Sequence, residues 1–211
     1  ANHDHLTGLA NRTLLYERLA ATIGEKARLD GSLAVFLLDL DGFKAVNDLH
    51  GHGIGDRLLR EVSMRLENGV RGADVKARLG GDEFVVVLDE SAGPDVVRTF
   101  AERLVALIAA PYQLEPENIQ VSVTTSIGIA LYPRDGNGPE ELLRSADTAL
   151  YRAKWAGRNC AAFFQPEMDR DIREQRTLEA GLQQALVRRE FTLAWQPIAK
   201  AADVTMISGF E

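Results

Sequence analysis

Cysteine is almost absent from the sequence, and positive charge is in deficit. The 211 residues contain a single cysteine, Cys160, which excludes an internal disulfide and fits a reducing compartment. Lysine and arginine number 24 against 31 aspartates and glutamates, so the formal net charge is −7. An acidic chain lacks the broad basic surface that nonspecific nucleic-acid binding requires, which argues against DNA and RNA as partners. A nucleotide substrate stays compatible with this charge, because metal ions can neutralise its phosphates locally.

Long apolar runs are missing as well. The stretch from Leu33 to Leu38 is far shorter than the roughly 20 residues that cross a bilayer. The polar start, Ala1 to His5, has none of the features of a signal peptide. The composition is otherwise that of a soluble globular protein, with 45% hydrophobic and 26% charged residues. A chain of this length accommodates one full domain and a fragment of a second.

Apolar periodicity predicts alternating helices and strands up to about residue 164. The helices are expected over 11–28, 54–68, 94–109 and from Pro139 to just before Gly157. An apolar run over 32–40 predicts a buried strand, β-prone runs on either side of Gly80-Gly81 predict a hairpin, and apolar odd positions over 119–131 predict another strand. This order embeds a βαββαβ pattern. We therefore expect an α/β (α+β, palm-like) fold, with a central mixed antiparallel sheet flanked by helices.

The character of the chain changes after about residue 164. Residues 167–189 have the pattern of a charged, amphipathic helix, and 191–197 that of a short strand. We expect a first domain over 1–164, a linker helix over 165–189 and the unfinished start of a second domain over 190–211.

Acidic residues are expected to converge at one edge of the sheet. Asp39 ends the buried strand, and Asp82 and Glu83 sit in the hairpin, where two glycines leave room for a ligand. An isolated aspartate at a strand end is commonly a turn cap. Several carboxylates at one edge repel one another unless a hard cation lies between them, and their oxygen atoms suit Mg²⁺ or Mn²⁺.

Basic and amide side chains near these acids suggest an anionic substrate. Lys44 lies at the expected start of a short helix, and Lys154 and Arg158 are four residues apart at the end of the fourth helix. Such a pair can also be a solvated helix terminus that complements the dipole. Asn47 and Asp56 offer groups suited to the edge of a guanine base, since adenine would leave the carboxylate unpaired. A cap or turn role is the ordinary alternative for each of them.

Four segments, in order and at compatible spacing, resemble the GGDEF family of diguanylate cyclases. Gly80-Gly81-Asp82-Glu83-Phe84 is the signature that names the family. The opening segment Asp4-His-Leu-Thr-Gly-Leu-Ala-Asn-Arg12 agrees with it, as do Asp39–Asp48 with Gly51–Asp56. The segment Ala149–Asn159 is similar to the closing part of the family pattern. The resemblance covers most of residues 4–160.

The resemblance implies a metal-dependent active site. By it, Asp39 and Asp82 are metal ligands, helped by the backbone carbonyl of Leu40, for two Mg²⁺ or Mn²⁺ ions per active site. Asp82 and Glu83 form the catalytic pair, with Glu83 accepting the proton of the attacking hydroxyl or orienting water. These positions are all intact in this sequence.

The resemblance also implies the substrate and the assembly. GTP is bound through Lys44, Lys154 and Arg158 at its β- and γ-phosphates and through Asn47 and Asp56 at guanine. Two domains then meet as a homodimer, so that each 3′-hydroxyl attacks the other α-phosphate and cyclic di-GMP forms. GTP and the reduced cysteine point to the cytoplasm, with the parent protein's membrane anchoring left open.

Two further resemblances concern regulation. Arg71 and Asp74, with Asp74 six positions before Gly80, match the RxxD site at which cyclic di-GMP inhibits the family; an ordinary surface ion pair is the alternative. Either Arg98 or Arg103 could complete that site. The tail over 186–211, ending in Gly209-Phe210-Glu211, resembles the start of an EAL phosphodiesterase domain, which implies a covalent EAL neighbour in the parent protein and no phosphodiesterase activity here.

Two competing functions stay open at this point. In one, the domain is a GTP-binding regulatory module that controls an adjoining EAL cyclic di-GMP phosphodiesterase and makes little product. In the other, it is a dimerisation scaffold without nucleotide, which leaves the converging acids and lysines unexplained.

Overall fold

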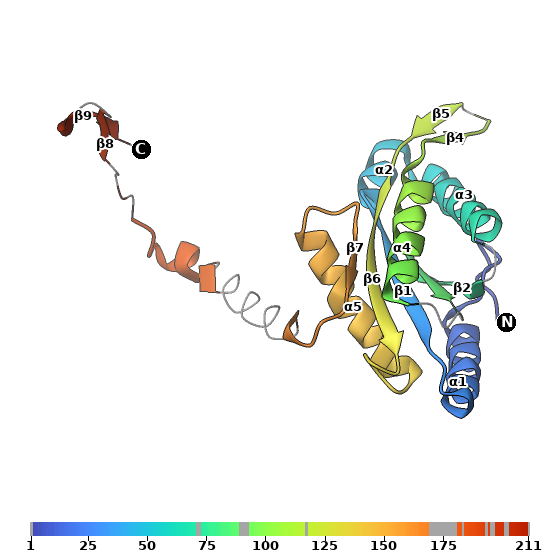
Figure 1. Cartoon of the computed structure of the whole chain (residues 1–211). Coiled ribbons are helices and arrows are strands. Elements are labelled where there is room, and N and C mark those ends of the chain that lie inside the picture. The colour runs from blue at the N-terminus through green and yellow to red at the C-terminus, as the bar shows by residue number, and fades with distance from the viewer. Residues whose placement is uncertain are drawn as a thin grey trace. The chain divides into compact units, whose positions relative to one another are not determined.

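The structure is a computed structural model, and it describes residues 2–70, 73–88, 93–116, 118–168, 181–182, 184–192, 194, 197–200 and 203–210. The chain divides into two compact units, Ala1–Asp169 and Arg170–Glu211. The first unit holds most of the secondary structure, and all of the predicted site residues belong to it (Figure 1).

Five named helices and seven strands make up the first unit in the described residues. In chain order they are α1 (Arg12–Leu29), β1 (Leu33–Asp41), α2 (Phe43–His50), α3 (His52–Gly69), β2 (Ala73–Gly80), β3 (Glu83–Leu88), α4 (Pro94–Ala109), β4 (Tyr112–Leu114), β5 (Ile119–Val121), β6 (Thr124–Tyr132), α5 (Pro139–Trp155) and β7 (Ala161–Phe163). The predicted helices are confirmed to within two residues at each end, and the hairpin at Gly80-Gly81 is confirmed.

The central sheet has five strands in the order β2-β3-β1-β6-β7. Strands β2, β3, β1 and β6 pair antiparallel with their neighbours, whereas β7 is parallel to β6. The mixed sheet and the βαββαβ order predicted from the sequence are therefore confirmed, with β1, β2, β3 and β6 as its four strands.

Alternate residues of β1 face two separate cores. Ala34, Phe36 and Leu38 pack with α3 and α4, while Leu33, Val35 and Leu37 pack with α1 and α5. All six side chains are buried, which explains why the run is apolar without polar alternation. Helices thus cover both faces of the sheet, and β1 runs through its centre (Figure 1).

The strand predicted over 119–131 is in fact two strands. Residues Ile119–Val121 pair with β4 in a separate two-stranded sheet, and only Thr124–Tyr132 join the central sheet. The physical reason is that Thr124 pairs with Asp41, the last residue of β1, so upstream residues have no partner on β1. The guanidinium of Arg57 donates to the carbonyl of Glu115 at 2.9 Å, which fastens the small sheet to α3.

The second unit contains β8 (Pro197–Lys200) and β9 (Asp203–Phe210), which pair antiparallel. Residues 181–182 and 184–188 are helical, within the predicted linker helix, and residues 169–180 of that prediction lie outside the described part. Of the strand predicted over 191–197, residues 191, 192 and 194 are not in a strand, whereas residue 197 is the first residue of β8. Within the described ranges, we find no helix with the length and apolar character needed to cross a membrane.

Candidate active site

The hairpin and the end of β1 bring the predicted acids together. Asp39 lies directly opposite Glu83 in the pairing of β1 with β3. The backbone N–H of Leu40 donates to the carbonyl of Asp82 at 3.3 Å. Gly80 pairs with Glu83, so only Gly81 and Asp82 form the turn, and Gly81 has a φ of 55°, a conformation that glycine adopts without strain. The register of the sheet therefore fixes where the three carboxylates lie.

Burial and neighbouring negative charge raise the pKa of Asp82 and that of Glu83. Burial is the largest cause of the raised pKa of Asp82, followed by the negative charge of Asp39. The pKa of Glu83 is raised by burial and then by the charges of Asp39, Asp147 and Asp82. In the described part of the chain, no three histidine, cysteine or acidic side chains form a ready cage for a metal ion. A divalent cation would thus take one or two carboxylates here and further oxygen ligands from a bound molecule, which is the usual arrangement for Mg²⁺.

An arginine that the sequence analysis passed over supports the hairpin turn. Arg78 donates from Nε and Nη2 to the carbonyl of Gly81, at 3.1 and 2.7 Å, and from Nη1 to Oδ1 of Asp4 at 3.0 Å. Thr7 donates to the same oxygen from its backbone and its hydroxyl. Burial raises the pKa of Asp4, but the hydrogen bonds from Thr7 and Arg78 outweigh it and lower the pKa overall. The opening segment therefore positions the turn that carries Asp82.

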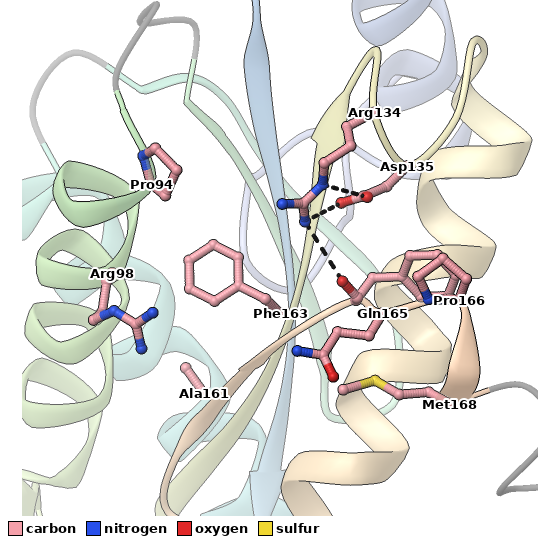
Figure 2. Close-up of a pocket in the computed structure, with 10 residues that line it drawn as sticks. Pro94, Arg98, Arg134, Asp135, Ala161, Phe163, Gln165, Pro166 and Met168 are labelled. Carbon is pink, nitrogen blue, oxygen red and sulfur yellow. Dashed lines mark hydrogen bonds and ion pairs between the residues drawn. The ribbon is translucent and has the colours of Figure 1, made fainter.

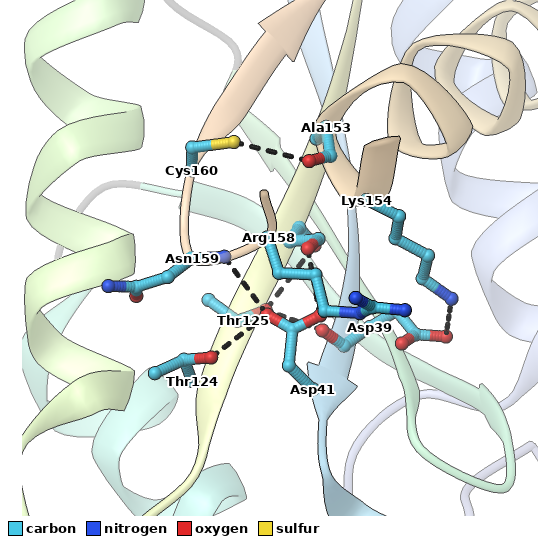
Figure 3. Close-up of polar contacts among 10 residues, drawn as sticks. Asp39, Asp41, Thr124, Thr125, Ala153, Lys154, Arg158, Asn159 and Cys160 are labelled. Carbon is cyan, nitrogen blue, oxygen red and sulfur yellow. Dashed lines mark hydrogen bonds and ion pairs between the residues drawn. The ribbon is translucent and has the colours of Figure 1, made fainter. Parts of the chain in front are cut away.

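The predicted phosphate ligands Lys154 and Arg158 both face the acidic end of β1. Nζ of Lys154 is 2.7 Å from Oδ2 of Asp39, and Nε of Arg158 is 3.9 Å from Oδ1 of Asp41 (Figure 3). They do not meet through helical spacing, as the sequence suggested, because α5 ends at Trp155 and Arg158 lies in a turn beyond it. Lys44 is exposed in the first turn of α2.

The two predicted base-reading residues lie on neighbouring helices. Asn47 is on α2 and Asp56 on α3, and both helices follow directly from the end of β1. Oδ1 of Asn47 is buried and has no hydrogen-bond partner among the described residues. A Cβ at Gly55 would lie 1.9 Å from that atom and 3.3 Å from the ring of Phe43. A buried acceptor without a donor suits a ligand that brings its own N–H groups, and exposed Asp56 stands one residue from Gly55.

Only part of the predicted inhibition site lies within the described residues. Arg71 lies outside the described residues, and so does the side chain of Asp74, whose backbone belongs to β2. Of the two arginines that could complete the site, Arg103 donates to the carbonyl of Gly69 at 3.4 Å, while Arg98 lies over the ring of Phe163.

A cavity of about 550 Å³ opens elsewhere, between the start of α4 and β7. It is lined by Arg98, Arg134, Asp135 and Phe163 among others (Figure 2). None of the predicted catalytic, metal-binding or substrate-binding residues lines it, and its Arg134 is already paired with Asp135 at 2.7 Å. The converging charges at the end of β1 are therefore the better candidate for chemistry.

Comparison with known proteins identifies the family of this chain. The family model described as "Diguanylate cyclase, GGDEF domain" matches residues 1–160. The chain is 48% identical, over 98% of its length, to MucR of Pseudomonas aeruginosa, a bifunctional diguanylate cyclase/cyclic di-GMP phosphodiesterase. It is 40% identical, over 96% of its length, to the cyclic di-GMP phosphodiesterase NbdA of the same organism. The chain spans 30% of MucR and 26% of NbdA.

Solved structures of GGDEF domains are similar to this chain as well. The GGDEF domain of TpbB from Pseudomonas aeruginosa superposes with a TM-score of 0.77 at 37% identity, over 81% of this chain and 99% of that one. The GGDEF domain of DgcB from Caulobacter crescentus, solved in complex with c-di-GMP, has a TM-score of 0.69 at 29% identity, over 77% of this chain and 92% of that one. With the family match over 160 of 211 residues and the palm-like sheet in common, the chain belongs to the GGDEF domain family.

Proposed function

We propose that this domain is a diguanylate cyclase, which condenses two molecules of GTP into cyclic di-GMP and two of pyrophosphate. The observation that carries the proposal is the meeting of Asp39, Asp82 and Glu83 with Lys154 at the end of β1. The intact signature and the cyclase relatives support it.

The donor set fits Mg²⁺ or Mn²⁺. Two ions per active site would be held by the carboxylates of Asp39 and Asp82 and the backbone carbonyl of Leu40, since hard cations prefer oxygen ligands. The raised pKa of Asp82 reflects burial first and then the negative charge of Asp39, which such an ion would offset. When bound, the metal would make the 3′-hydroxyl more acidic and offset charge on the departing pyrophosphate.

The protein's own groups would align the substrate. Lys44, Lys154 and Arg158 would hold the β- and γ-phosphates, and Lys154 would exchange its contact with Asp39 for one with phosphate. Asn47 and Asp56 would bind the guanine edge, accepting from its N–H groups.

Each bond change can be followed through these groups. The 3′-oxygen forms a bond to the α-phosphorus of the other GTP, and the bond from that phosphorus to the bridging oxygen breaks to release pyrophosphate. Glu83 would accept the proton of the hydroxyl, which its raised pKa favours. Because each domain would hold one GTP, catalysis requires a homodimer with the two sites face to face. A GTP substrate would place the domain in the cytoplasm.

A second function is supported by the phosphodiesterase relatives and by the tail that resembles an EAL start. In it the domain binds GTP, makes little product and controls an adjoining EAL domain in the parent protein. Incubation of the purified protein with GTP and Mg²⁺, followed by chromatography, separates the two. Cyclic di-GMP with pyrophosphate supports the cyclase, whereas GTP binding by calorimetry without product supports the regulatory function.

Gly55→Ala is expected to weaken GTP binding by about tenfold or more. The new methyl group would need the space of the Asn47 amide, 1.9 Å away, and displacing one hydrogen bond to the base costs about that factor. Calorimetry with GTP gives the affinity, and Gly53→Ala is the matched control on the same helix, since nothing lies within 4 Å of that position. Unchanged affinity in Gly55→Ala would rule out the assignment of Asn47.

Arg71→Ala is expected to spare turnover and to relieve inhibition by the product. A bidentate arginine on guanine or phosphate, with Asp74 alongside, suits cyclic di-GMP. The measurement is the initial rate at increasing concentrations of added cyclic di-GMP. Inhibition that is as strong in Arg71→Ala as in the wild type would place the inhibitory site elsewhere.

A further inference from the structure

The turn after α5 has an unusual backbone. Gly157, Arg158 and Asn159 have φ values of 113°, 63° and 48° in succession. Residues other than glycine rarely adopt this region unless their surroundings hold them there. Arg158, a proposed phosphate ligand, is the central residue of this strained turn. Something must therefore stabilise the turn.

The carboxylate of Asp41 lies against this turn and is 6% exposed. Oδ2 accepts from the backbone N–H of Asn159 at 3.1 Å and from the hydroxyl of Thr124 at 3.0 Å. Oδ1 accepts from the hydroxyl of Ser126 at 2.8 Å. Figure 3 shows the turn and the carboxylate facing each other at the end of β1. Hydrogen bonds to an ionised acceptor are among the stronger ones in proteins, so this carboxylate can offset the strain.

The flanks of the turn are fixed separately. The backbone N–H of Arg158 and the thiol of Cys160 both donate to the carbonyl of Ala153, at 3.2 and 3.4 Å. The backbone N–H of Ile127 donates to the carbonyl of Cys160 at 2.9 Å. Asp41 thus holds the residue that follows Arg158, while α5 and β6 hold the two ends.

The contact between Asp41 and the Arg158 side chain itself is loose. The distance of 3.9 Å is long for a hydrogen bond, and the arginine side chain is 64% exposed. The guanidinium is free to turn toward a substrate, whereas its backbone is fixed. Asp39 and Lys154, at 2.7 Å, form a second acid–base pair beside it.

We propose that Asp41 is a positioning residue: it holds the 157–159 turn in its left-handed form and so directs the guanidinium of Arg158 at the substrate phosphates. The inference rests on the proposed function for the identity of the substrate. It assigns Asp41 a role apart from that of Asp39, although the two side chains are two residues apart on one strand.

The affinity test uses 3′-deoxy-GTP with Mg²⁺, which lacks the attacking hydroxyl and therefore cannot turn over. Asp41→Asn is expected to bind it about tenfold more weakly, in line with one lost charged hydrogen bond. In the background of Arg158→Ala, the same change is expected to alter affinity less than about twofold, because interacting residues are not additive. Equal losses in both backgrounds would overturn the proposal.

A matched control separates positioning from general stability. Asp135 is also a buried carboxylate, with 3% exposure, and accepts from the backbone N–H of Leu131 at 2.8 Å. Asp135→Asn is expected to lower the unfolding temperature without changing the affinity of the folded protein for 3′-deoxy-GTP. A loss of affinity as large as that of Asp41→Asn would reduce Asp41 to a structural residue.

The single cysteine gives a readout that does not depend on activity. Cys160 follows the turn directly, so loosening the turn is expected to speed its reaction with a thiol-specific reagent several-fold. Burial and then the charge of Asp41 raise the pKa of this thiol, so rates are compared at the plateau reached at high pH. Thr124→Val keeps the charge, removes one hydrogen bond to Asp41 and is expected to act in the same direction with a smaller effect.

Failure of the proposed function and failure of the role of Asp41 give different results. A wild-type protein that fails to bind 3′-deoxy-GTP would refute the proposed function and the direction of Arg158 at phosphate. The thiol rates would still decide whether Asp41 holds the turn. Unchanged rates in both Asp41→Asn and Thr124→Val would overturn that part.

Discussion

Asp82→Asn is expected to lower cyclic di-GMP formation by at least about a thousandfold, the several kcal/mol that metal coordination supplies to a transition state. The change keeps the size of the side chain and removes the charge that would bind the metal ion. Initial rates with GTP and Mg²⁺ measure the loss. Asp95→Asn, at an exposed position in the first turn of α4, is the matched control and is expected to retain full turnover.

The same variant is expected to be more stable than the wild type at pH 7 in the absence of Mg²⁺. Burial and the charge of Asp39 raise the pKa of Asp82 above its ordinary value of 3.8. The folded state therefore holds its proton more tightly than the unfolded state, and stability falls as the pH rises from 3.8 through the raised pKa. Asparagine has no proton to lose there, so the variant lacks this fall.

Urea unfolding across this pH range tests the predicted effect of the Asp82 charge on stability, and the rate of cyclic di-GMP formation tests its predicted role in catalysis. Lost turnover in a protein that unfolds at higher urea would show that Asp82 serves function at a cost in stability. Retained turnover in Asp82→Asn would refute the metal assignment, and a less stable variant at pH 7 would show that Lys154 and the other cations already compensate the acids.

Gly128→Ala is expected to destabilise the fold by about 3 kcal/mol or more, at the upper end of the range for overpacked cores. Gly128 is in β6, directly under α5, and a Cβ there would lie 1.9 Å from the carbonyl of Ala146 and 2.3 Å from the nitrogen of Leu150. Both contacts are to backbone, which cannot turn aside as a flexible side chain can. The helix would have to move away from the sheet and carry Lys154 with it.

Denaturant unfolding gives the magnitude, and Gly24→Ala is the control. Gly24 lies in α1 with nothing within 4 Å of an added Cβ, and alanine in a helix interior is favoured over glycine by about 0.5–1 kcal/mol. The two glycine-to-alanine changes are therefore expected to have opposite signs. A fully stable Gly128→Ala protein would contradict the close packing of α5 on β6.

The sequence was informative where the pattern is local. The apolar spacing of α1, α4 and α5 and the glycine pair of the hairpin each carry their own signal, and these elements were predicted almost to the residue. The break between Val121 and Thr124 was not predictable in this way, because apolar alternation continues across it. It depends on where β1 ends, which is a long-range property of the sheet.

The site residues divide in the same way, into those with a local sequence signal and those that depend on distant partners. Asp39, Asp82 and Lys154 follow from a motif, whereas Arg78 and Asp41 were passed over because their partners are distant in sequence, with Arg78 bonded to Asp4 and Asp41 to Asn159. For Arg78, two local signals could have been used: its position two residues before the glycine pair, and the spacing of Asp4 and Thr7, which is typical of a side-chain turn. The identity of their partners required the fold.

The most direct test of the central claim is the dependence of the initial rate of cyclic di-GMP formation on protein concentration at saturating GTP and Mg²⁺. If two domains each supply one GTP to a shared reaction, the rate rises more steeply than linearly until the dimer is fully formed. Product whose rate is linear in protein at every concentration, down to well below any measured dimerisation constant, would contradict the account, as would GTP binding without product at any concentration.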